Sequence, residues 1–305
     1  MEPATQRTPS KWMVLAAAQS LLFLFGLPPL CRMYWDALFG SMPSQKISEI
    51  LLVIVPPSVC VILYNIVMAP IYYYQIPYFE QYKIQKDRPW PWLDEREKVR
   101  RAFWDLSARS IKITAINLGI ILPVMSIAKV FLIDEMLGTV NPRAFDTSDE
   151  HWPSPAENAR NILLMAVLHE FGFYVTHRML HAYPALYRYH KVHHEYKMNT
   201  TLAAQHNHPV DHVLSIGGPA LLAVSLVNPH SVSVFQWTIY TMMGNLDDHV
   251  GYAFPWSPVR WFPFSAGTDE HEFHHSKNMG CFGFKLSIFN SLFGGYDCYL
   301  EKKFE

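Results

Sequence analysis

Histidines gather in the second half of this chain. All fifteen lie at residue 151 or beyond, and eight of them fall in three short motifs, HRMLH, HKVHH and HEFHH. On a helix, spacings of three and four residues bring side chains to one face, about 5–6 Å apart at their Cβ atoms, so each motif can direct its imidazoles at a common point. The motif histidines are His177, His181, His190, His193, His194, His271, His274 and His275.

Metal binding is the chemistry that these motifs favour. One pair of histidines four residues apart is more often a surface feature or a hydrogen-bonded core pair, but here three motifs occur and two share the pattern HxxHH. Zinc is satisfied by four ligands, and catalytic zinc by three from the protein, so eight histidines predict two metal ions. Imidazole also binds copper, iron and nickel, so the residue type does not choose the metal. The four cysteines form no CxxC pair, which argues against a structural zinc site.

The rest of the chain is suited to a membrane. Half of its residues are apolar, 17% are charged and the net charge is −1, a balance that argues against nucleic acid as a partner. Apolar runs of about 20 residues cover 12–31, 50–69 and 111–133, which is the length that a bilayer core requires. Prolines inside such runs are tolerated in membrane helices. We expect three transmembrane helices here; the alternative is buried helices of a soluble protein.

Charge in the connecting segments predicts the orientation. Nine basic residues lie between residues 83 and 112, which places this segment in the cytosol by the positive-inside rule. The N-terminus is then cytosolic too, and the acidic segment 134–150 faces the lumen. We expect residues 161–175 to return the chain to the cytosol. Residues 213–243 would enter and leave the membrane as a helical hairpin, so that the C-terminus is also cytosolic.

These observations predict an all-α integral membrane protein with about four transmembrane helices and a histidine-rich helical cap on the cytosolic side. Residues 1–160 would form the transmembrane scaffold and residues 161–305 the catalytic domain. The chain ends in KKFE, with Lys302 and Lys303 at the fourth and third positions from the end. This ending resembles the dilysine retrieval signal of endoplasmic reticulum membrane proteins, so we expect that membrane to be the location.

The histidine motifs and their surroundings resemble the fatty acid hydroxylase and sterol desaturase superfamily of membrane di-iron oxygenases. Within it, the C-4 methylsterol oxidases are most similar, through the segments HRMLHAYPALYRYHKVHHEY, HNHPVDH, DDHVGYAFPWSP and HEFHHSKNMGCFGF. The resemblance covers roughly residues 160–299, and before it only the hydrophobic plan is shared. It implies that the second half of the chain is a fatty acid hydroxylase-type di-iron domain.

The resemblance also implies the ligands and the cofactor. The eight motif histidines would bind two iron ions, with O2 as co-substrate, and zinc can replace iron on purification. His249, where the family has HSGY, is a further expected ligand, and His208 in HP is a candidate ligand. Three nearby histidines are expected to support the ligands: His169, His206 and His212. His151 and His230 lie on expected lumenal turns, away from the metal.

Acidic residues near the motifs could fix the ligands. Each could accept the free N–H of a ligating imidazole and so set its tautomer; the alternative is that they are solvated surface charges. The six are Glu170, Glu195, Asp211, Asp247, Asp248 and Glu272.

Oxidation of an unactivated C–H bond by O2 needs electrons, and the sequence shows no motif for a cofactor that would supply them. It contains no GxGxxG turn for a nicotinamide or flavin and no haem attachment motif. The resemblance implies a b-type cytochrome and its NADH-dependent reductase as electron donors. The basic segment 83–112 could dock an acidic carrier. Its simpler explanation is a positive-inside anchor, with Trp90, Trp92 and Trp104 at the headgroup level.

The resemblance implies a lipid substrate, oxidised at the C-4 methyl group of a sterol or triterpenoid. The chain departs from the subgroup in two places, because HVGYA replaces HSGYD and GCF replaces GNY. These changes predict a less polar pocket. They leave open a specialised hydroxylase or desaturase of another terpenoid or fatty acyl lipid. A third alternative, from another class, is a non-catalytic lipid- or metal-binding membrane protein.

Overall fold

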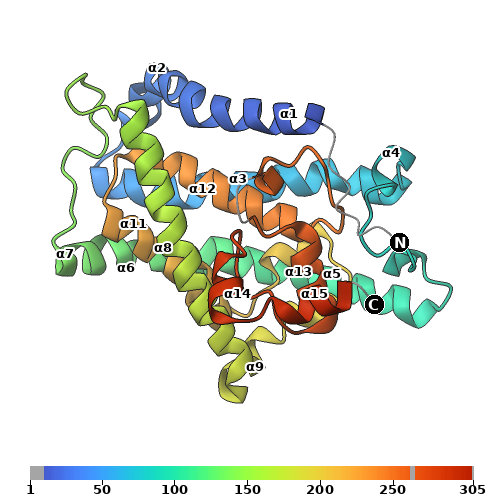
Figure 1. Cartoon of the computed structure of the whole chain (residues 1–305). Coiled ribbons are helices and arrows are strands. Elements are labelled where there is room, and N and C mark those ends of the chain that lie inside the picture. Colours follow the sequence, from blue (N-terminus) through green and yellow to red (C-terminus); the bar gives the residue numbers. More distant parts are fainter. Residues whose placement is uncertain (1–9, 262–264, 304–305) are drawn as a thin grey trace.

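The computed structural model describes residues 10–261 and 265–303, and within them the protein is helical (Figure 1). No strand ladder forms among the described residues; the isolated bridges Lys83–Tyr252 and Ser265–Leu286 are the exceptions to a helix-and-loop chain. The predicted all-α class is therefore confirmed. Four helical segments are long and apolar enough to cross a membrane, which agrees with the predicted number.

The first candidate span, Lys11–Phe39, is a rod of three helices in succession. It contains α1 (Ser10–Leu21), the π-helical turn η1 (Leu22–Gly26) and α2 (Leu27–Phe39). A π-turn shifts the backbone hydrogen-bond pattern, and side chains from other helices bond to carbonyls here. Gln236 donates to the carbonyl of Phe23, and Asn158 to that of Leu24. The first rod is thus tied to the second half of the chain.

The second candidate span is α3 (Gln45–Tyr74). The hydroxyl of Ser44 accepts a hydrogen bond from the amide of Ile47 and so caps its first turn. The helix ends at Gln75, which adopts the left-handed conformation. The apolar run 50–69 lies inside α3, so the prediction located the span and missed its more polar ends.

The third candidate span covers Glu97–Leu137. It joins α5 (Glu97–Ile116), η3 (Asn117–Ile121), α6 (Leu122–Ala128), η4 (Lys129–Ile133) and α7 (Asp134–Leu137). The predicted span 111–133 is again its apolar centre. Half of the expected basic loop therefore belongs to α5, which is preceded by the short helices α4 (Pro77–Glu80) and η2 (Pro91–Leu93).

The fourth candidate span is Pro209–Val227 rather than the predicted crossing at 161–175. It contains α10 (Pro209–Asp211), η7 (His212–Gly217) and α11 (Gly218–Val227), and α12 (Ser231–Asp248) follows it as the second arm of the expected hairpin. Residues 161–175 belong to α8 (Pro155–Ala182). That helix buries polar side chains inside the protein, including Asn158, Asn161, His169 and Glu170, which lower its hydropathy.

Short helices complete the histidine-bearing cap. They are α9 (Pro184–His190), η5 (His193–Glu195), η6 (Thr201–Gln205), η8 (Pro258–Trp261), α13 (Thr268–Lys277), α14 (Ile288–Phe293) and α15 (Asp297–Lys303). The last two residues of the KKFE ending lie outside the described residues.

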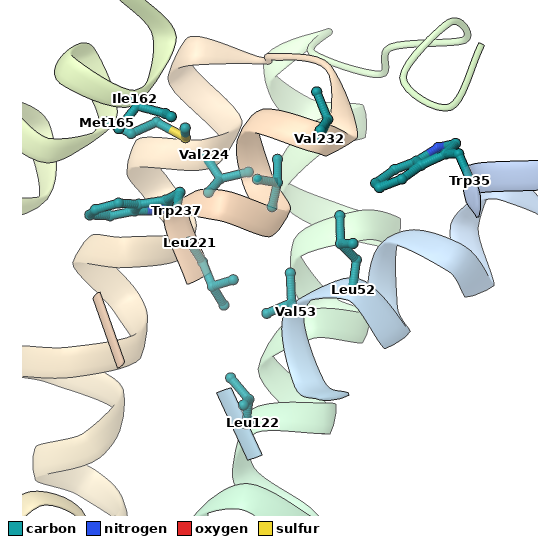
Figure 2. Close-up of a cluster of buried hydrophobic side chains, with 11 residues drawn as sticks. Trp35, Leu52, Val53, Leu122, Ile162, Met165, Leu221, Val224, Val232 and Trp237 are labelled. Carbon is teal, nitrogen blue, oxygen red and sulfur yellow. The ribbon is translucent and has the colours of Figure 1, made fainter. Parts of the chain in front are cut away.

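The two halves of the chain share one hydrophobic core. Figure 2 shows Trp35, Leu52 and Leu122 from the first three spans beside Met165 and Trp237 from α8 and α12. Met165 is fully buried, and Trp35 and Trp237 are nearly so. The proposed boundary at residues 160/161 falls inside α8, so the core helix that carries the first histidine motif is also part of the scaffold.

The connecting segments lie on two sides of the helices (Figure 1). The start of α1, the segment around α4 and the end of α15 lie on one side, to the right of the view. Helix α7 and the loop 138–154 lie on the other side. The described ends of the chain are therefore on the side of the basic segment.

This arrangement predicts that the two sides can be labelled separately. Asp87 and Asp149 have side chains that are 79% and 96% exposed and lie on opposite sides. In sealed vesicles of one orientation, a maleimide that cannot cross the membrane should label only one of Asp87→Cys and Asp149→Cys, and permeabilisation should expose the other. The unsubstituted chain, with its own four cysteines, gives the background. Equal labelling of both variants in sealed vesicles would contradict the fold as a membrane-crossing protein.

Candidate metal centre

Nine histidines of the described chain converge in two groups. The ligand atoms of each group lie within 4.8 Å of one another. The first group contains His177, His181, His190, His194 and His274, and the second contains His193, His249, His271 and His275. The eight motif histidines and His249 are thus brought together.

The two HxxHH motifs each serve both groups. From the first motif, His190 and His194 join the first group while His193 joins the second; from the second motif, His271 and His275 join the second group while His274 joins the first. On an α-helix such as α13, adjacent residues project about 100° apart, so neighbouring histidines face different points. Each motif therefore bridges the two groups, and moving either would disturb both.

Backbone and carboxylate oxygens fix the orientation of five of these rings. Each ring donates from Nδ1 to an oxygen that can only accept, so Nδ1 carries the proton and Nε2 of the neutral ring keeps its lone pair. The bonds run from His177 to the Phe282 carbonyl at 2.9 Å, from His190 to Asp211 at 2.9 Å, from His249 to the Asn245 carbonyl at 2.7 Å, from His274 to the Gly280 carbonyl at 2.6 Å and from His275 to the Tyr196 carbonyl at 3.1 Å.

The Nε2 atoms then face one another without a proton between them. Nε2 of His177 lies 3.1 Å from that of His190, and Nε2 of His249 lies 3.2 Å from that of His275. Two lone pairs at this distance repel, and a cation between them removes the conflict. Metal–imidazole bonds of about 2.0–2.1 Å, as for zinc, separate two ligand nitrogens by about 2.9–3.4 Å. Both groups therefore fit a metal ion.

Burial keeps these imidazoles in the ligating form. Loss of solvent lowers the pKa of His249 and of His274 to about 3, and that of His181 to about 2. Neighbouring histidines add to the lowering of the pKa at His274 and His181, and Lys285 adds to it at His249. Neutral imidazole is the form that binds a metal. Nδ1 of His193 and of His194 and Nε2 of His274 are buried without any hydrogen-bond partner among the described residues.

The turn after the last motif supplies one of the orienting carbonyls. Helix α13 ends at Asn278, which is left-handed, and Gly280 follows with φ = 62°. A Cβ on Gly280 would come within 2.2 Å of the Cys298 sulfur, so only glycine fits. The glycine thus allows the tight turn that brings its carbonyl to His274.

Among the six acidic neighbours, Asp211 holds a histidine of the two groups. Its Oδ2 accepts from His190, and its Oδ1 accepts from the Ser215 hydroxyl at 2.8 Å. Both the aspartate and His190 are buried. The arrangement fixes the tautomer and direction of the ring, which raises the basicity of its ligating nitrogen.

The other five acidic residues brace the surroundings of the histidines. Glu195 pairs with Arg109 and accepts from His206 at 2.9 Å. Glu272 accepts from Gln85 and from the Asn199 amide. Burial raises the pKa of Glu272 to about 7. The remaining three, Glu170, Asp247 and Asp248, contact residues that line a large cavity.

His208 is not brought to either group. It caps α10, where its Nδ1 accepts from the Val210 amide at 3.2 Å, and its ring packs on Tyr189 at 4.7 Å. Pro209 begins the helix directly after it, so the HP pair marks a helix start. His151 and His230 belong to neither group, and both contact Asp146. His212 is buried with both ring nitrogens unpaired among the described residues.

A large cavity adjoins this part of the protein. Its volume is about 780 Å³, and α8, α12 and the η1 turn form its walls, with segments 254–258 and 284–288 closing it. Most of its lining is apolar, but His169, Glu170, Asp247 and Lys285 contribute polar side chains. The position of this cavity could not be predicted from the sequence, because it forms between helices that are distant in the chain.

The two departures from the methylsterol oxidase pattern do not line the cavity. Val250 is buried in a hydrophobic cluster with Tyr72 and Trp90, and its carbonyl accepts from the Tyr72 hydroxyl at 2.8 Å. The amide of Ala253 donates to the carbonyl of Tyr82. The expected loss of polarity at Val250 and Ala253 therefore does not reach this cavity. The second departure lies at the histidines instead, where the Phe282 ring is 5.2 Å from that of His181.

Comparison with known families now identifies the second half of the chain. Residues 162–295 match the family described as fatty acid hydroxylase. They form a fatty acid hydroxylase domain. Its bounds enclose all nine converging histidines, so the resemblance seen in the motifs is confirmed.

Curated relatives carry two different names. Methylsterol monooxygenase 2-2 of Arabidopsis thaliana is 32% identical over 123 residues, 40% of this chain and 46% of the relative. Very-long-chain aldehyde decarbonylase GL1-11 of Oryza sativa subsp. japonica is 34% identical over 114 residues, 37% and 42% of the two chains. Methylsterol monooxygenase 1 of Gallus gallus is 28% identical over 251 residues, 79% and 76% of the two chains.

The matches to the Arabidopsis and rice proteins span less than half of those relatives. At similar identity, the two names do not choose one substrate for the domain. No solved structure matches this chain significantly. The site chemistry must therefore be argued from its own geometry.

The role of Asp211 can be tested against Glu195. Both are acidic residues that accept from a buried histidine, but His206, the partner of Glu195, belongs to neither group. Removing a carboxylate that holds a metal ligand typically costs about 10–100-fold in metal affinity. Asp211→Ala should therefore lose its metal at about 10–100-fold lower chelator concentration than the unsubstituted protein, with metal content measured by plasma mass spectrometry. Glu195→Ala should lose its metal at nearly the same chelator concentration as the unsubstituted protein. Equal retention in both variants would contradict this role.

Proposed function

We propose that this protein is a membrane-bound di-iron oxygenase that oxidises an unactivated C–H bond of a lipid, most simply the C-4 methyl group of a sterol or triterpenoid. The observation that carries the proposal is the pair of buried histidine groups beside a lipid-sized, mainly apolar cavity. Fatty acid hydroxylase domain and methylsterol monooxygenase relatives support it.

Iron bound by the two groups would supply the reduction of O2 that no side chain can perform. The chain's own residues do the rest. Nε2 atoms of the nine histidines would hold the ions, and the carbonyls of Phe282, Asn245 and Tyr196 keep the rings in the ligating tautomer. Burial of the histidines excludes bulk water from the centre.

The cavity supports a lipid substrate. Its volume of about 780 Å³ lies within the range of about 300–1,000 Å³ usual for small-molecule sites. Leu163 and Met243 line it and are also 63% and 38% exposed. On a protein with four candidate membrane spans, such residues face lipid, so the substrate would enter sideways from the bilayer.

Two alternative functions can be compared with this proposal. Oxidation of another terpenoid or fatty acyl lipid would use the same centre and cavity, and the aldehyde decarbonylase relatives fit that wider class. A non-catalytic lipid- or metal-binding protein would need no oxidising centre. The pairing of two complete histidine groups with a cavity favours the enzyme.

Electrons would come from a b-type cytochrome and its NADH-dependent reductase. We propose the endoplasmic reticulum membrane as the location. Both ends and the histidine cap would lie in the cytosol, because the basic segment 83–112 lies on the side of the described ends (Figure 1). Arg101 and Arg109 on α5 are 77% and 58% exposed, so an acidic carrier could bind there.

Metal content tests the centre. Protein purified in detergent should contain about two metal ions per chain, with iron and zinc counted together by plasma mass spectrometry, since eight or more histidines exceed the needs of one ion. His193→Ala removes a member of the second group and should lower the count. His208→Ala, which lies outside both groups, should not. One ion or none in well-folded protein would overturn the two-iron proposal.

Turnover tests the enzyme. With a reductase, a b-type cytochrome, NADH and a 4-methylsterol in vesicles, the protein should consume O2 only when the sterol is present. Loss of a residue that hydrogen-bonds to a metal ligand typically lowers activity ~10–100-fold. His193→Ala removes an expected ligand itself and should lower the rate of O2 consumption by more than this, whereas His208→Ala should leave the rate nearly unchanged. Metal-loaded protein that binds sterol without consuming O2 would support the binding-protein alternative.

A further inference from the structure

The cavity is polar at the end that faces the histidine groups. Along α8, its lining runs from apolar residues at 159–166 to His169 and Glu170; along α12, it runs from largely apolar residues at 237–243 to Gly244 and Asp247. Both helices then continue to histidines, at His177 and at His249. The lining along α12, residues 237–247, is about 16 Å long. A lipid in the cavity would thus bring one end toward the metal centre.

The charged side chains Lys285 and Glu170 at this end have charged or amide partners, whereas Nε2 of His169 has no hydrogen-bond partner among the described residues. The ammonium of Lys285 lies 2.5 Å from Asp248, and both are buried. Gly244 leaves room for this lysine, since a Cβ there would come within 2.6 Å of its Cε. Glu170 accepts from the amides of Phe284 and Lys285. These contacts hold segment 284–286 against α8 and α12.

Asp247 has a carboxylate oxygen that is free. Its Oδ2 accepts from the hydroxyl of Ser257 at 2.8 Å and from that of Thr268 at 3.4 Å, while its Oδ1 has no hydrogen bond among the described residues. The side chain lines the cavity. Thr268 is the first residue of α13, so Asp247 is fixed between α12, which ends at His249, and α13, which carries His271 and His275.

A carboxylate can only accept hydrogen bonds. It therefore selects a ligand that donates, and an anionic head group would meet a like charge. The neighbouring lysine does not offset this charge, because it is paired with Asp248. The group that fits is a hydroxyl on an otherwise apolar lipid.

We propose that Asp247 is a specificity-determining residue that accepts a hydrogen bond from a hydroxyl group on the substrate, carried at the end of the lipid that enters next to the metal centre. This inference rests on the proposed lipid oxygenase function and names the residue that would recognise a hydroxyl group near the oxidised carbon. Fatty acids and phospholipids are disfavoured, as are lipids whose hydroxyl lies at the far end.

Equilibrium binding tests the proposal independently of turnover. Trp237 and Trp256 line the cavity, so quenching of tryptophan fluorescence reports the ligand in the full-length protein. The probes are a 4,4-dimethylsterol with a 3-hydroxyl group and its 3-deoxy and 3-keto analogues. A hydrogen bond to a charged group predicts that the 3-hydroxy sterol binds about 10–100-fold more tightly than the 3-deoxy sterol.

Substitutions separate this role from a general effect on the cavity. Asp247→Ala should reduce the preference for the 3-hydroxy sterol to about 3-fold or less, since the bond to the charged acceptor is lost. Asp247→Asn should shift the preference toward the 3-keto sterol, because an amide can donate to a carbonyl. Damage to the fold would not produce that shift. Ser20→Ala is the matched control, since Ser20 lines the cavity and its hydroxyl donates to the Ala16 carbonyl.

The outcomes are distinct. Binding of the 3-hydroxy and 3-deoxy sterols with equal affinity, or a full preference retained in Asp247→Ala, overturns the role of Asp247 and leaves the lipid oxygenase proposal standing. Failure of all three sterols to bind metal-loaded protein overturns the sterol substrate itself, and with it the identity of the proposed hydroxyl donor.

Discussion

The convergence of imidazole lone pairs is the constraint on which the rest of this structure depends. His177 faces His190, and His249 faces His275, at about the spacing of two ligands on one ion. Without a cation, each contact would be repulsive and buried, which is among the costly arrangements in a protein interior. The polypeptide nevertheless fixes the rings in this direction by donating each Nδ1 proton to an oxygen. The site is thus built for a positive charge that the chain itself does not provide.

This constraint explains why scaffold and cap cannot be separated. The orienting carbonyls come from residues far apart in the chain, among them Asn245 on α12 and Tyr196 after η5. Helix α8 contributes Met165 to the shared core and His177 to the first group. Helix α12 contributes Trp237 to that core and ends at His249. Precise placement of the histidines therefore relies on packing that begins at residues such as Trp35 in the first span.

Local patterns could be predicted from the sequence, and long-range pairings could not. The i, i+4 spacing placed His177 with His181 because a helix fixes that relation. Adjacent histidines such as His193 and His194 face different points, but which group each one joins depends on how η5 and α13 meet, and this the spacing does not encode. His208 was a candidate by its motif, although the proline after it is itself a signal for a helix start.

Hydropathy is also a local property, so it predicts apolar segments but not which residues a helix contacts. It located the apolar centres of three spans, because those segments face outward for most of their length; only 11–28% of each candidate window is buried in the protein. The crossing predicted at 161–175 is not among the candidate spans, since α8 turns polar side chains such as His169 and Glu170 into the protein and these lower its hydropathy. A polar residue lowers hydropathy equally whether it meets water or a buried partner. Two of those inward polar side chains, His169 and Glu170, make the histidine-facing end of the cavity polar. The polar residues that keep α8 out of the candidate spans therefore also give the cavity one polar end and one apolar end.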